Sequence, residues 1–214
     1  MDFRKLRNHL VVCGWKDDMA DILGDILALS GGFEADRVVV VSNMEPEKVE
    51  AVKDADGLRD VKFVRGDYFS EPALERAGVR NALKVLVLAD TLESTAASEV
   101  DSKTVMTVLA VKAIARDVYV CAEILDKKYE SYLRHAGCDE ILFSRDFSRR
   151  ILANTSATNG MSHIIFELLS RDRSRSRLAT CDIPPEFSGR AFRDYRAAFD
   201  GDAGRILLGI LENT

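Results

Sequence analysis

The sequence predicts an α/β protein built on a Rossmann-like, doubly wound, parallel sheet of six strands. Three observations indicate this fold class. Short apolar runs alternate with helical patterns six times along residues 9–143. Residues 38–41 are all valine, and continuous β-branched runs are typical of parallel strands buried on both faces. The first apolar run breaks at Gly14 and continues into a helical pattern, as in the first βαβ unit of nucleotide-binding folds.

The elements follow one another in a regular order. Residues 9–13 form the first strand, and the helical spacing from Met19 predicts a helix that ends at residues 30–32, Ser-Gly-Gly. The later strands are expected at 38–41, 61–64, 84–88, 118–122 and 140–143, with helices at 45–56, 71–77, 103–114 and 127–135. A long polar loop at 89–102 carries the acids Asp90, Glu93, Glu99 and Asp101 and no basic residue.

The pattern changes after residue 143, the expected end of the first domain, 1–143. A helix at 145–156, a turn and a helix at 161–170 predict a helix-turn-helix crossover within a second segment, 144–177. Apolar residues cover too much of the later helix for a surface helix, so it should be buried against another surface. The expected dimer-interface residues are Met161, Ile164, Ile165, Phe166 and Leu168.

The end of the chain is expected to add only a small lobe. The basic run 171–177 is interpreted as a solvated linker. Residues 178–214, with a strand expected at 206–210, are too few for a complete second domain. The sequence therefore predicts a small, incomplete α+β lobe at the C-terminus.

The composition narrows the class of protein. A length of 214 residues with 47% apolar residues suits one domain and an appended lobe. No apolar run approaches the roughly 20 residues that span a bilayer, and no signal-peptide core is present, so the chain as given is expected to be cytoplasmic. The four cysteines lack paired spacing and are expected to be reduced structural thiols. A net charge of −5 argues against nucleic acid as a partner.

The turn after the first strand matches a dinucleotide site poorly. Of the three glycines in that template, only Gly14 is present, because Lys16 and Met19 stand at the other two positions. Asp17 and Asp18 add negative charge to the first helical turn, where a phosphate would bind. NAD is therefore an unlikely cofactor.

The same conclusion follows from the second strand and from the histidines. The second strand ends in Ser42, where dinucleotide enzymes carry an acid for the ribose. An NAD-dependent oxidoreductase would also need a general acid or base near the strand ends. His9 opens a strand, His135 lies late in a helix, and His163 lies on the apolar crossover helix. We therefore expect no enzymatic activity.

Five segments together resemble the RCK domain, the regulator of potassium conductance. They are HLVVCGW at 9–15, VRGD at 64–67, LERAGV at 74–79, LRHAGCD at 133–139 and NGM at 159–161. The likeness is greatest to prokaryotic calcium-gated potassium channels and covers about residues 7–214. It implies a cytoplasmic, ligand-sensing domain that acts on a potassium channel pore in the membrane. Family members pair through a helix-turn-helix crossover and assemble into an octameric ring, the gating ring.

The resemblance also implies where calcium is held. Calcium-gated members use one acid after the fourth strand and two alternating acids after the fifth. Glu123 matches the first of the pair, Leu125 stands at the second position, and Ala89 stands at the position after the fourth strand, with Asp90 next to it. Glu123 and Asp90 are thus the expected metal ligands.

Other acids remain candidates because Ca²⁺ takes about 6 to 8 oxygen ligands. Glu93, Glu99 and Asp101 of the polar loop, or Glu34 and Asp36 before the second strand, could supply them. The alternative interpretation is a solvated acidic loop with no bound ion.

A nucleotide-binding regulatory subunit of a potassium transporter, like the Trk subunits, is the second functional hypothesis. The chain shares Gly66 and Asp67 with that class but lacks two glycines of the first turn. Gly14, Gly66 and Asp67 are therefore expected to be remnants of cofactor-binding positions. Fold alone does not separate the two hypotheses.

Overall fold

The structure is a computed structural model that describes residues 2–29, 33–92, 94, 96–169, 182–199 and 207–209. The chain divides into two compact units, residues 1–166 and 167–214. No helix within these described ranges is both long and apolar enough to cross a membrane.

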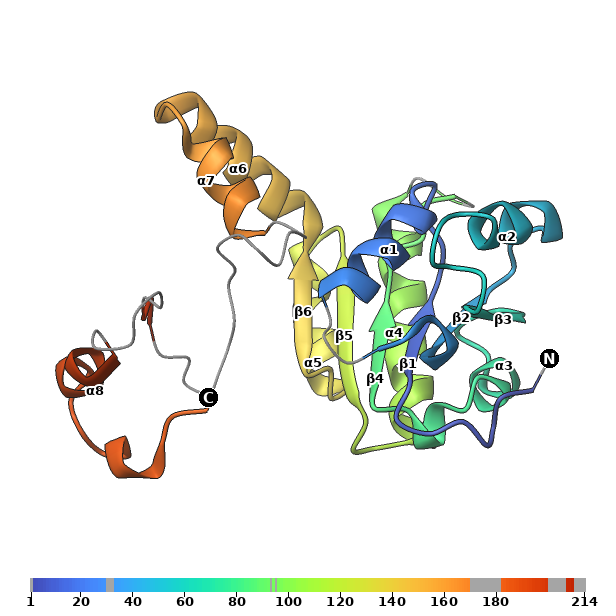
Figure 1. Cartoon of the computed structure of the whole chain (residues 1–214). Coiled ribbons are helices and arrows are strands. Elements are labelled where there is room, and N and C mark those ends of the chain that lie inside the picture. The colour runs from blue at the N-terminus through green and yellow to red at the C-terminus, as the bar shows by residue number, and fades with distance from the viewer. Residues whose placement is uncertain are drawn as a thin grey trace. The chain divides into compact units, whose positions relative to one another are not determined.

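The first unit is organised around a six-stranded parallel sheet (Figure 1). The strand order is β3-β2-β1-β4-β5-β6. Successive strands are added outward from β1 on one side and outward from β4 on the other, so the point where the order changes lies between β1 and β4. The strands are β1 (Leu10–Cys13), β2 (Val38–Ser42), β3 (Lys62–Arg65), β4 (Lys84–Val87), β5 (Tyr119–Ile124) and β6 (Glu140–Phe143). The predicted Rossmann-like, doubly wound sheet is confirmed.

Five helices pack on the sheet or connect its strands. They are α1 (Met19–Leu29), α2 (Pro46–Lys53), α3 (Glu71–Arg76), α4 (Ala97–Ile114) and α5 (Glu130–His135), with short 3-10 turns at Ala35–Arg37, Val79–Asn81 and Lys127–Tyr129. The helix α4 begins at Ala97 and not at Lys103 as expected. Val100 and Asp101 lie in its first turns and are buried, so they are part of the packed face of the helix. Asp101 and Glu99 are consequently helix residues, and their assignment to a loop was wrong.

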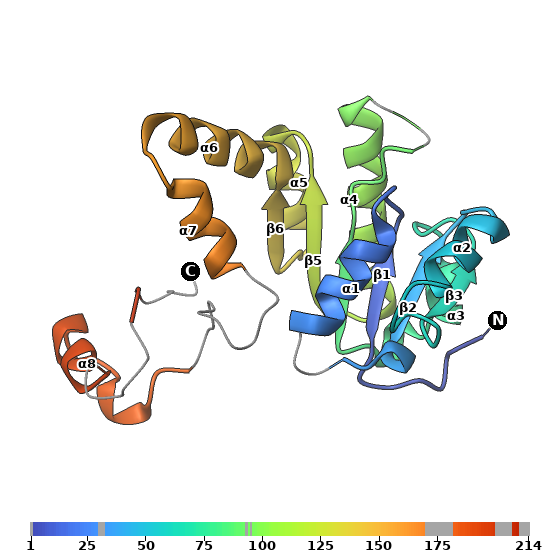
Figure 2. The ribbon, with the colours of Figure 1, turned by 45° about the horizontal axis from the view of Figure 1, so that its top comes forward.

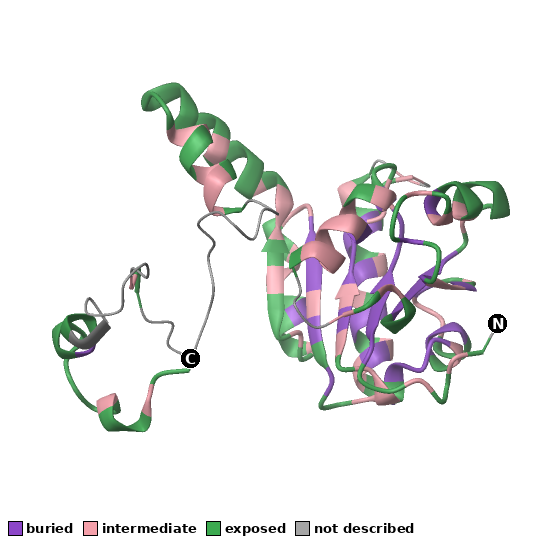
Figure 3. Ribbon diagram, in the orientation of Figure 1, coloured by how far each residue is buried: buried purple, intermediate pink, exposed green. Residues whose placement is uncertain are grey.

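Two apolar cores lie on the two faces of the sheet. Val11 and Val39 belong to the core formed with α3, α4 and α5, whereas Val12 and Val40 belong to the core formed with α1 and α2. All four side chains are fully buried. Successive residues of a strand point to opposite faces, so β1 and β2 are covered on both sides. Figure 3 shows this buried centre of the sheet.

A helical hairpin follows the last strand. The helix α6 (Ser144–Ala157) starts at the residue after β6 ends, and a turn at 158–160 leads to α7 (Met161–Leu168) (Figure 2). The predicted helix-turn-helix crossover is thus present. No residue of α6 or α7 is buried.

The second unit contains a 3-10 turn at Pro185–Phe187 and the helix α8 (Phe192–Phe199). The Phe187 and Tyr195 rings lie 4.9 Å apart. Residues 207–209 are not a strand, and the ends of the strand expected at 206–210 lie outside the described residues, as does the basic run 171–177.

Candidate functional site: a carboxylate edge that holds Lys16

The candidate site lies where β1, β4 and β5 end, at the carboxyl edge of the sheet. Gly14 turns the chain away from β1 with a φ of +97°, and a Cβ at this position would lie 3.2 Å from the Leu88 carbonyl oxygen. Only glycine fits both the left-handed conformation and the close approach. The tight turn brings Trp15 and Lys16 across the ends of the neighbouring strands.

Glu123 is the central acid of this edge. It lies inside β5, one residue before the strand ends, and not after the strand as expected. Lys16 Nζ lies 2.9 Å from each of its carboxylate oxygens, Oε1 and Oε2. The backbone N–H of Ala89 donates a hydrogen bond of 2.9 Å to Oε2. The Glu123 side chain is 7% exposed and that of Lys16 is 23% exposed, so the ion pair is largely shielded from water.

Asp90 lies three residues after the end of the neighbouring strand, β4, at Val87. Its Oδ2 accepts a hydrogen bond of 3.0 Å from the backbone N–H of Trp15, and its Oδ1 accepts one of 3.1 Å from Leu92. Trp15 and Lys16 therefore connect the two predicted metal ligands, since one bonds Asp90 and the next bonds Glu123. The N–H group of Trp15, which follows the glycine turn, donates to a carboxylate of the chain itself.

This arrangement holds a positive charge between strand ends. Two carboxylates and one ammonium give the cluster a net charge of −1, and the ammonium is the Lys16 side chain at the position of the template's second glycine. Within the described residues, no group of three or more His, Cys, Asp or Glu side chains is placed to hold a metal ion. From Glu123 and Asp90 alone, a divalent cation at this edge would have two carboxylates, with water as its other ligands.

Asp101 makes a contribution that the sequence interpretation missed. Its Oδ1 and Oδ2 accept hydrogen bonds of 2.9 Å from the backbone N–H groups of Leu125 and Asp126, directly after β5. Burial raises the pKa of Asp101, and the two backbone donors oppose that shift. Asp101 therefore fixes the loop after the strand that carries Glu123. Asp101 precedes Thr104 and Val108, two buried residues of α4, at helical spacing. That spacing is the sequence signal that could have placed Asp101 on the buried side of the helix.

The other acids considered from the sequence lie elsewhere. Glu99 is exposed on α4, where Ser94 and Lys103 lower its pKa. Glu34 and Asp36 are exposed before β2, at the opposite edge of the sheet from Glu123. Glu93 lies outside the described residues.

The positions expected as cofactor remnants have local structural roles. Asp67 accepts a hydrogen bond from the Asn43 side chain, which ties the loops after β2 and β3 together. A Cβ on Gly66 would lie 3.1 Å from the Ala73 Cβ, so this position is kept small by α3. No contact of Gly66 or Asp67 links them to Glu123 among the described hydrogen bonds.

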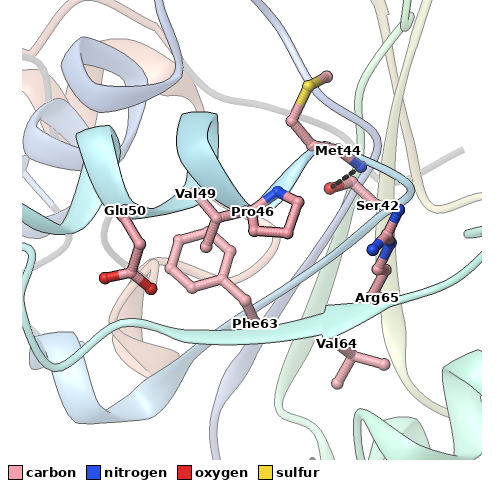
Figure 4. A pocket seen from close by; sticks show the side chains of 8 residues that line it. All are labelled: Ser42, Met44, Pro46, Val49, Glu50, Phe63, Val64 and Arg65. Atoms are coloured by element: carbon pink, nitrogen blue, oxygen red, sulfur yellow. Dashed lines mark hydrogen bonds between the residues drawn. The ribbon is translucent and has the colours of Figure 1, made fainter.

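A separate cavity of about 170 Å³ lies at the ends of β2 and β3 (Figure 4). Phe63, Val49 and Pro46 form an apolar wall, and Arg65 and Glu50 stand at its sides. The Ser42 hydroxyl there accepts a hydrogen bond of 3.3 Å from the Met44 backbone N–H. This cavity contains none of the predicted metal ligands.

The predicted dimer-interface residues divide into two groups on α7. Met161, Ile165 and Leu168 are half-buried. Ile164 is 57% exposed and Phe166 is 72% exposed. Ile164 and Phe166 therefore expose apolar surface on α7.

Comparison with known proteins gives the family. Residues 5–122 match the family described as the calcium-activated potassium channel slowpoke-like RCK domain. The calcium-gated potassium channel TvoK of Thermoplasma volcanium is 26% identical over 186 residues, which cover 85% of this chain and 50% of that protein. The chain spans about half the length of TvoK and of the putative potassium channel protein YugO of Bacillus subtilis.

Solved structures agree on the fold. The human SLO3 gating ring is similar with a TM-score of 0.55 and 17% identity, over 85% of this chain and 32% of that one. GsuK bound to ADP is similar with a TM-score of 0.54 and 13% identity, over 86% of this chain and 47% of that one. At these identities the likeness concerns the fold alone. The family match, by contrast, spans more than half of the sequence and runs from β1 into β5. The chain therefore belongs to the slowpoke-like RCK domain family of calcium-activated potassium channels.

Proposed function

We propose that this chain is a ligand-sensing regulatory domain on the cytoplasmic side of a potassium channel, and that it couples divalent cation binding to pore opening. Membership of the RCK family supports the regulatory role. A relative that is named a calcium-gated potassium channel supports calcium as the cation. The proposed role is regulation and not catalysis. The proposed assembly is a dimer, and a ring built from such dimers.

The Lys16 ammonium on Glu123 is the observation that carries the cation-sensing proposal. It supports the proposal because the buried Glu123 carboxylate already pairs with a positive charge, and a second carboxylate, Asp90, lies just after the neighbouring strand. Oxygen ligands of this kind are those that Ca²⁺ takes. Glu123 and Asp90 would hold the ion, and Lys16 would leave Glu123. With so few protein ligands, the dissociation constant is expected near 10⁻³ M, roughly the weak end of the range.

The ion pair also suggests how binding acts on the domain. Lys16 belongs to the turn after β1, and Glu123 belongs to β5, so their contact clamps that turn to a strand two positions away in the sheet. Loss of the contact frees the turn. A ligand shifts such an equilibrium only by the difference in its affinity for the two arrangements. The cation and Lys16 compete for Glu123, so the cation binds more tightly to the arrangement in which Lys16 has left that carboxylate.

A calcium titration followed by thermal unfolding tests this proposal. We expect Ca²⁺ to raise the melting temperature of the wild-type chain at millimolar concentrations and to have less effect on Glu123→Gln and Asp90→Asn. In Lys16→Gln the amide still donates a hydrogen bond to Glu123, but the competing charge is gone. A charged hydrogen bond is worth about 1.5 kcal/mol, so the calcium midpoint should fall about tenfold.

Lys53→Gln is the matched control, because Lys53 forms an exposed ion pair with Glu50 on α2, 3.0 Å long. Its calcium midpoint should equal that of the wild type at constant ionic strength. Equal stabilisation of the wild type and both carboxylate variants would place the site elsewhere, with Glu34 and Asp36 as the next candidates. Absence of stabilisation in all variants, including Lys16→Gln, would exclude calcium as the ligand.

We also propose that dinucleotides bind weakly or not at all. Lys16 fills the second glycine position, and the Trp15 N–H is bonded to Asp90. Calorimetric titration with NADH and with ADP checks this. A low-micromolar affinity for either would instead support the nucleotide-regulated transporter subunit.

A further inference from the structure

The first residues of the chain are bonded to α3 and to the turn after it. We call residues 2–8 the strap. The backbone N–H groups of Phe3 and Asn8 donate hydrogen bonds of 2.6 Å and 2.9 Å to the carbonyl oxygens of Arg76 and Asn81. These bonds tie the strap to the last residue of α3 and to the 3-10 turn that follows it (Figure 1).

Side chains complete the attachment of the strap. Phe3 and Leu6 are half-buried and pack against the core formed with α3, α4 and α5, while the other strap residues are exposed. The Arg37 side chain donates a hydrogen bond of 2.9 Å to the Arg7 carbonyl oxygen. A terminal segment with so much exposed backbone opens at a lower free energy than that of global unfolding. The strap is therefore a unit that can leave its place while the sheet stays folded.

Asn8, the last residue of the strap, has an unfavourable backbone conformation. Its φ is +51°, and it is the only residue other than glycine with a positive φ in the described ranges. A side chain disfavours this left-handed conformation, although asparagine tolerates it better than most residues. The contacts around the strap, and not the preference of Asn8, therefore hold the closed position.

His9 follows the strap directly and is fully buried. Its Nε2 lies 2.9 Å from the Ala77 carbonyl oxygen, and its Nδ1 has no hydrogen-bond partner among the described residues. A Cβ on Gly78 would lie 2.6 Å from the Phe3 carbonyl oxygen and 3.2 Å from His9 Cε1. The strap and the imidazole ring therefore meet at this glycine.

The two charges that act most on His9 are positive. They belong to Arg37, before β2, and to Lys62, on β3. Burial lowers the pKa of His9, and these two cations lower it further. The closed structure thus favours the neutral imidazole.

The acids near the strap do not compensate for these cations. Asp2 and Glu75 lie 3.6 Å and 3.8 Å from Arg4. Neither nitrogen of His9 is bonded to a carboxylate among the described residues. The other charged side chains on the strap and on the elements around it are mostly basic and include Lys5, Arg7, Asp36, Arg76, Arg80, Lys84 and Lys112.

A second proton on the ring would create a donor without an acceptor. Both nitrogens of a charged imidazole are donors. The Nε2–H group is bonded to Ala77, but an Nδ1–H group would have no acceptor while the strap is closed. A buried charge with an unpaired donor is strongly disfavoured. Removal of the strap would give this donor water as its acceptor.

We propose that His9 is a proton-operated latch for the strap. The neutral imidazole permits the closed position, and protonation of His9 releases residues 2–8 while the sheet stays folded. The latch gives the domain a proton as a second input. It involves neither Glu123 nor Asp90 and no residue of α6 or α7, so it stands or falls independently of cation sensing and of self-association.

Hydrogen exchange of the wild-type chain tests the latch. The reporters are the hydrogen-bonded amides of Phe3, Leu6 and Asn8, followed by mass spectrometry of peptides that cover the strap. Each protection factor is corrected for the intrinsic exchange rate at that pH. In the open strap His9 takes up a proton near pH 6.5, so protection should fall about eightfold between about pH 7.0 and 5.5. Low urea concentrations should leave the strap protection unchanged, because local opening exposes little surface.

Two kinds of variant assign the effect to one histidine. In His9→Gln the amide can donate to Ala77 but takes up no proton, so strap protection should not depend on pH. His135→Gln and His163→Gln change exposed histidines and should keep the wild-type pH dependence. Because histidine is the side chain whose ordinary pKa lies in this range, these two controls assign the wild-type effect to His9 even where His9→Gln does not fold.

The amides of β1 and β2 separate local opening from global unfolding. At about pH 5.5 they should stay at least tenfold better protected than the strap. Strap protection that does not change with pH in the wild type, or that changes equally in His9→Gln, would overturn the inference. Exchange of the strap and of β1 at equal rates and with equal urea dependence would also overturn it, because the strap would then open only when the whole domain unfolds.

Discussion

His9 is the residue whose chemistry most clearly links burial to stability. It is fully buried, and its Nε2 lies 2.9 Å from the Ala77 carbonyl oxygen. Its Nδ1 has no hydrogen-bond partner among the described residues. Burial lowers the pKa of His9, and the nearby Arg37 and Lys62 lower it further. The lowered pKa favours the neutral imidazole, with the proton on Nε2 as a donor to the Ala77 carbonyl oxygen.

A pH dependence of stability follows from this. Unfolded histidine takes up a proton near pH 6.5, so below that pH the unfolded chain binds more protons at this residue than the folded chain. The free energy of unfolding should fall as the pH drops below about 6.5, by at most about 1.4 kcal/mol per pH unit from His9. Urea unfolding between about pH 7.5 and 5.5 should show a shallower fall for His9→Gln than for the wild type. His135→Gln, at an exposed histidine, should match the wild type, and equal slopes in all three proteins would contradict the assignment.

At the scale of elements, the turn before the second 3-10 segment depends on a glycine. Gly78 has a φ of +76°, and a Cβ there would lie 2.6 Å from the Phe3 carbonyl oxygen. Gly57 has nearly the same φ, +75°, and nothing within 4 Å of its would-be Cβ. Gly57→Ala should therefore destabilise by about 1 kcal/mol, the cost of a left-handed conformation. Gly78→Ala should destabilise by roughly 2 to 3 kcal/mol, because backbone must also move. Urea unfolding measures both, and equal losses would rule out the clash.

The sequence was a good guide to the strands and a poorer guide to where helices begin. All six strands lie within about two residues of their expected positions, because their apolar runs are short and bounded by turns. The start of α4 was misplaced because Asp101 is polar yet buried, and only its bonds to Leu125 and Asp126 explain that burial. Those partners are 24 and 25 positions away, beyond the reach of a local pattern.

The same limit applied to the candidate site. The order of the elements was enough to place Glu123 and Asp90 at neighbouring strand ends. It was not enough to reveal that Lys16, 107 positions from Glu123, reaches that carboxylate. Lys16 was interpreted as an obstacle to phosphate, and the structure shows it also as the partner of the main predicted ligand.

At the scale of the whole molecule, α7 should control assembly. Phe166 is 72% exposed, and replacing it with a charge in an apolar interface leaves that charge without water. We expect Phe166→Asp to raise the dimer dissociation constant by about tenfold or more, as an interface anchor worth over about 1.4 kcal/mol is lost.

Thr158→Asp provides the control for charge alone, since Thr158 is exposed in the turn between α6 and α7. Sedimentation velocity over a range of concentrations compares the two variants with the wild type. A wild-type chain that stays monomeric at tens of micromolar, or variants with equal dissociation constants, would refute the role given to α7.

The junction of β6 with α6 has a mechanical consequence. Glu123 pairs in register with Leu142, and Ile124 pairs with Phe143, the residue before α6 begins. The carboxylate thus sits beside the base of a rigid arm of 14 residues, which at about 1.5 Å per residue is about 21 Å long. A rotation of only about 6° at that base moves the far end of the arm by about 2 Å. Because no loop separates β6 from α6, a small rearrangement around Glu123 that turns the base of α6 would be amplified at the far end of the helix.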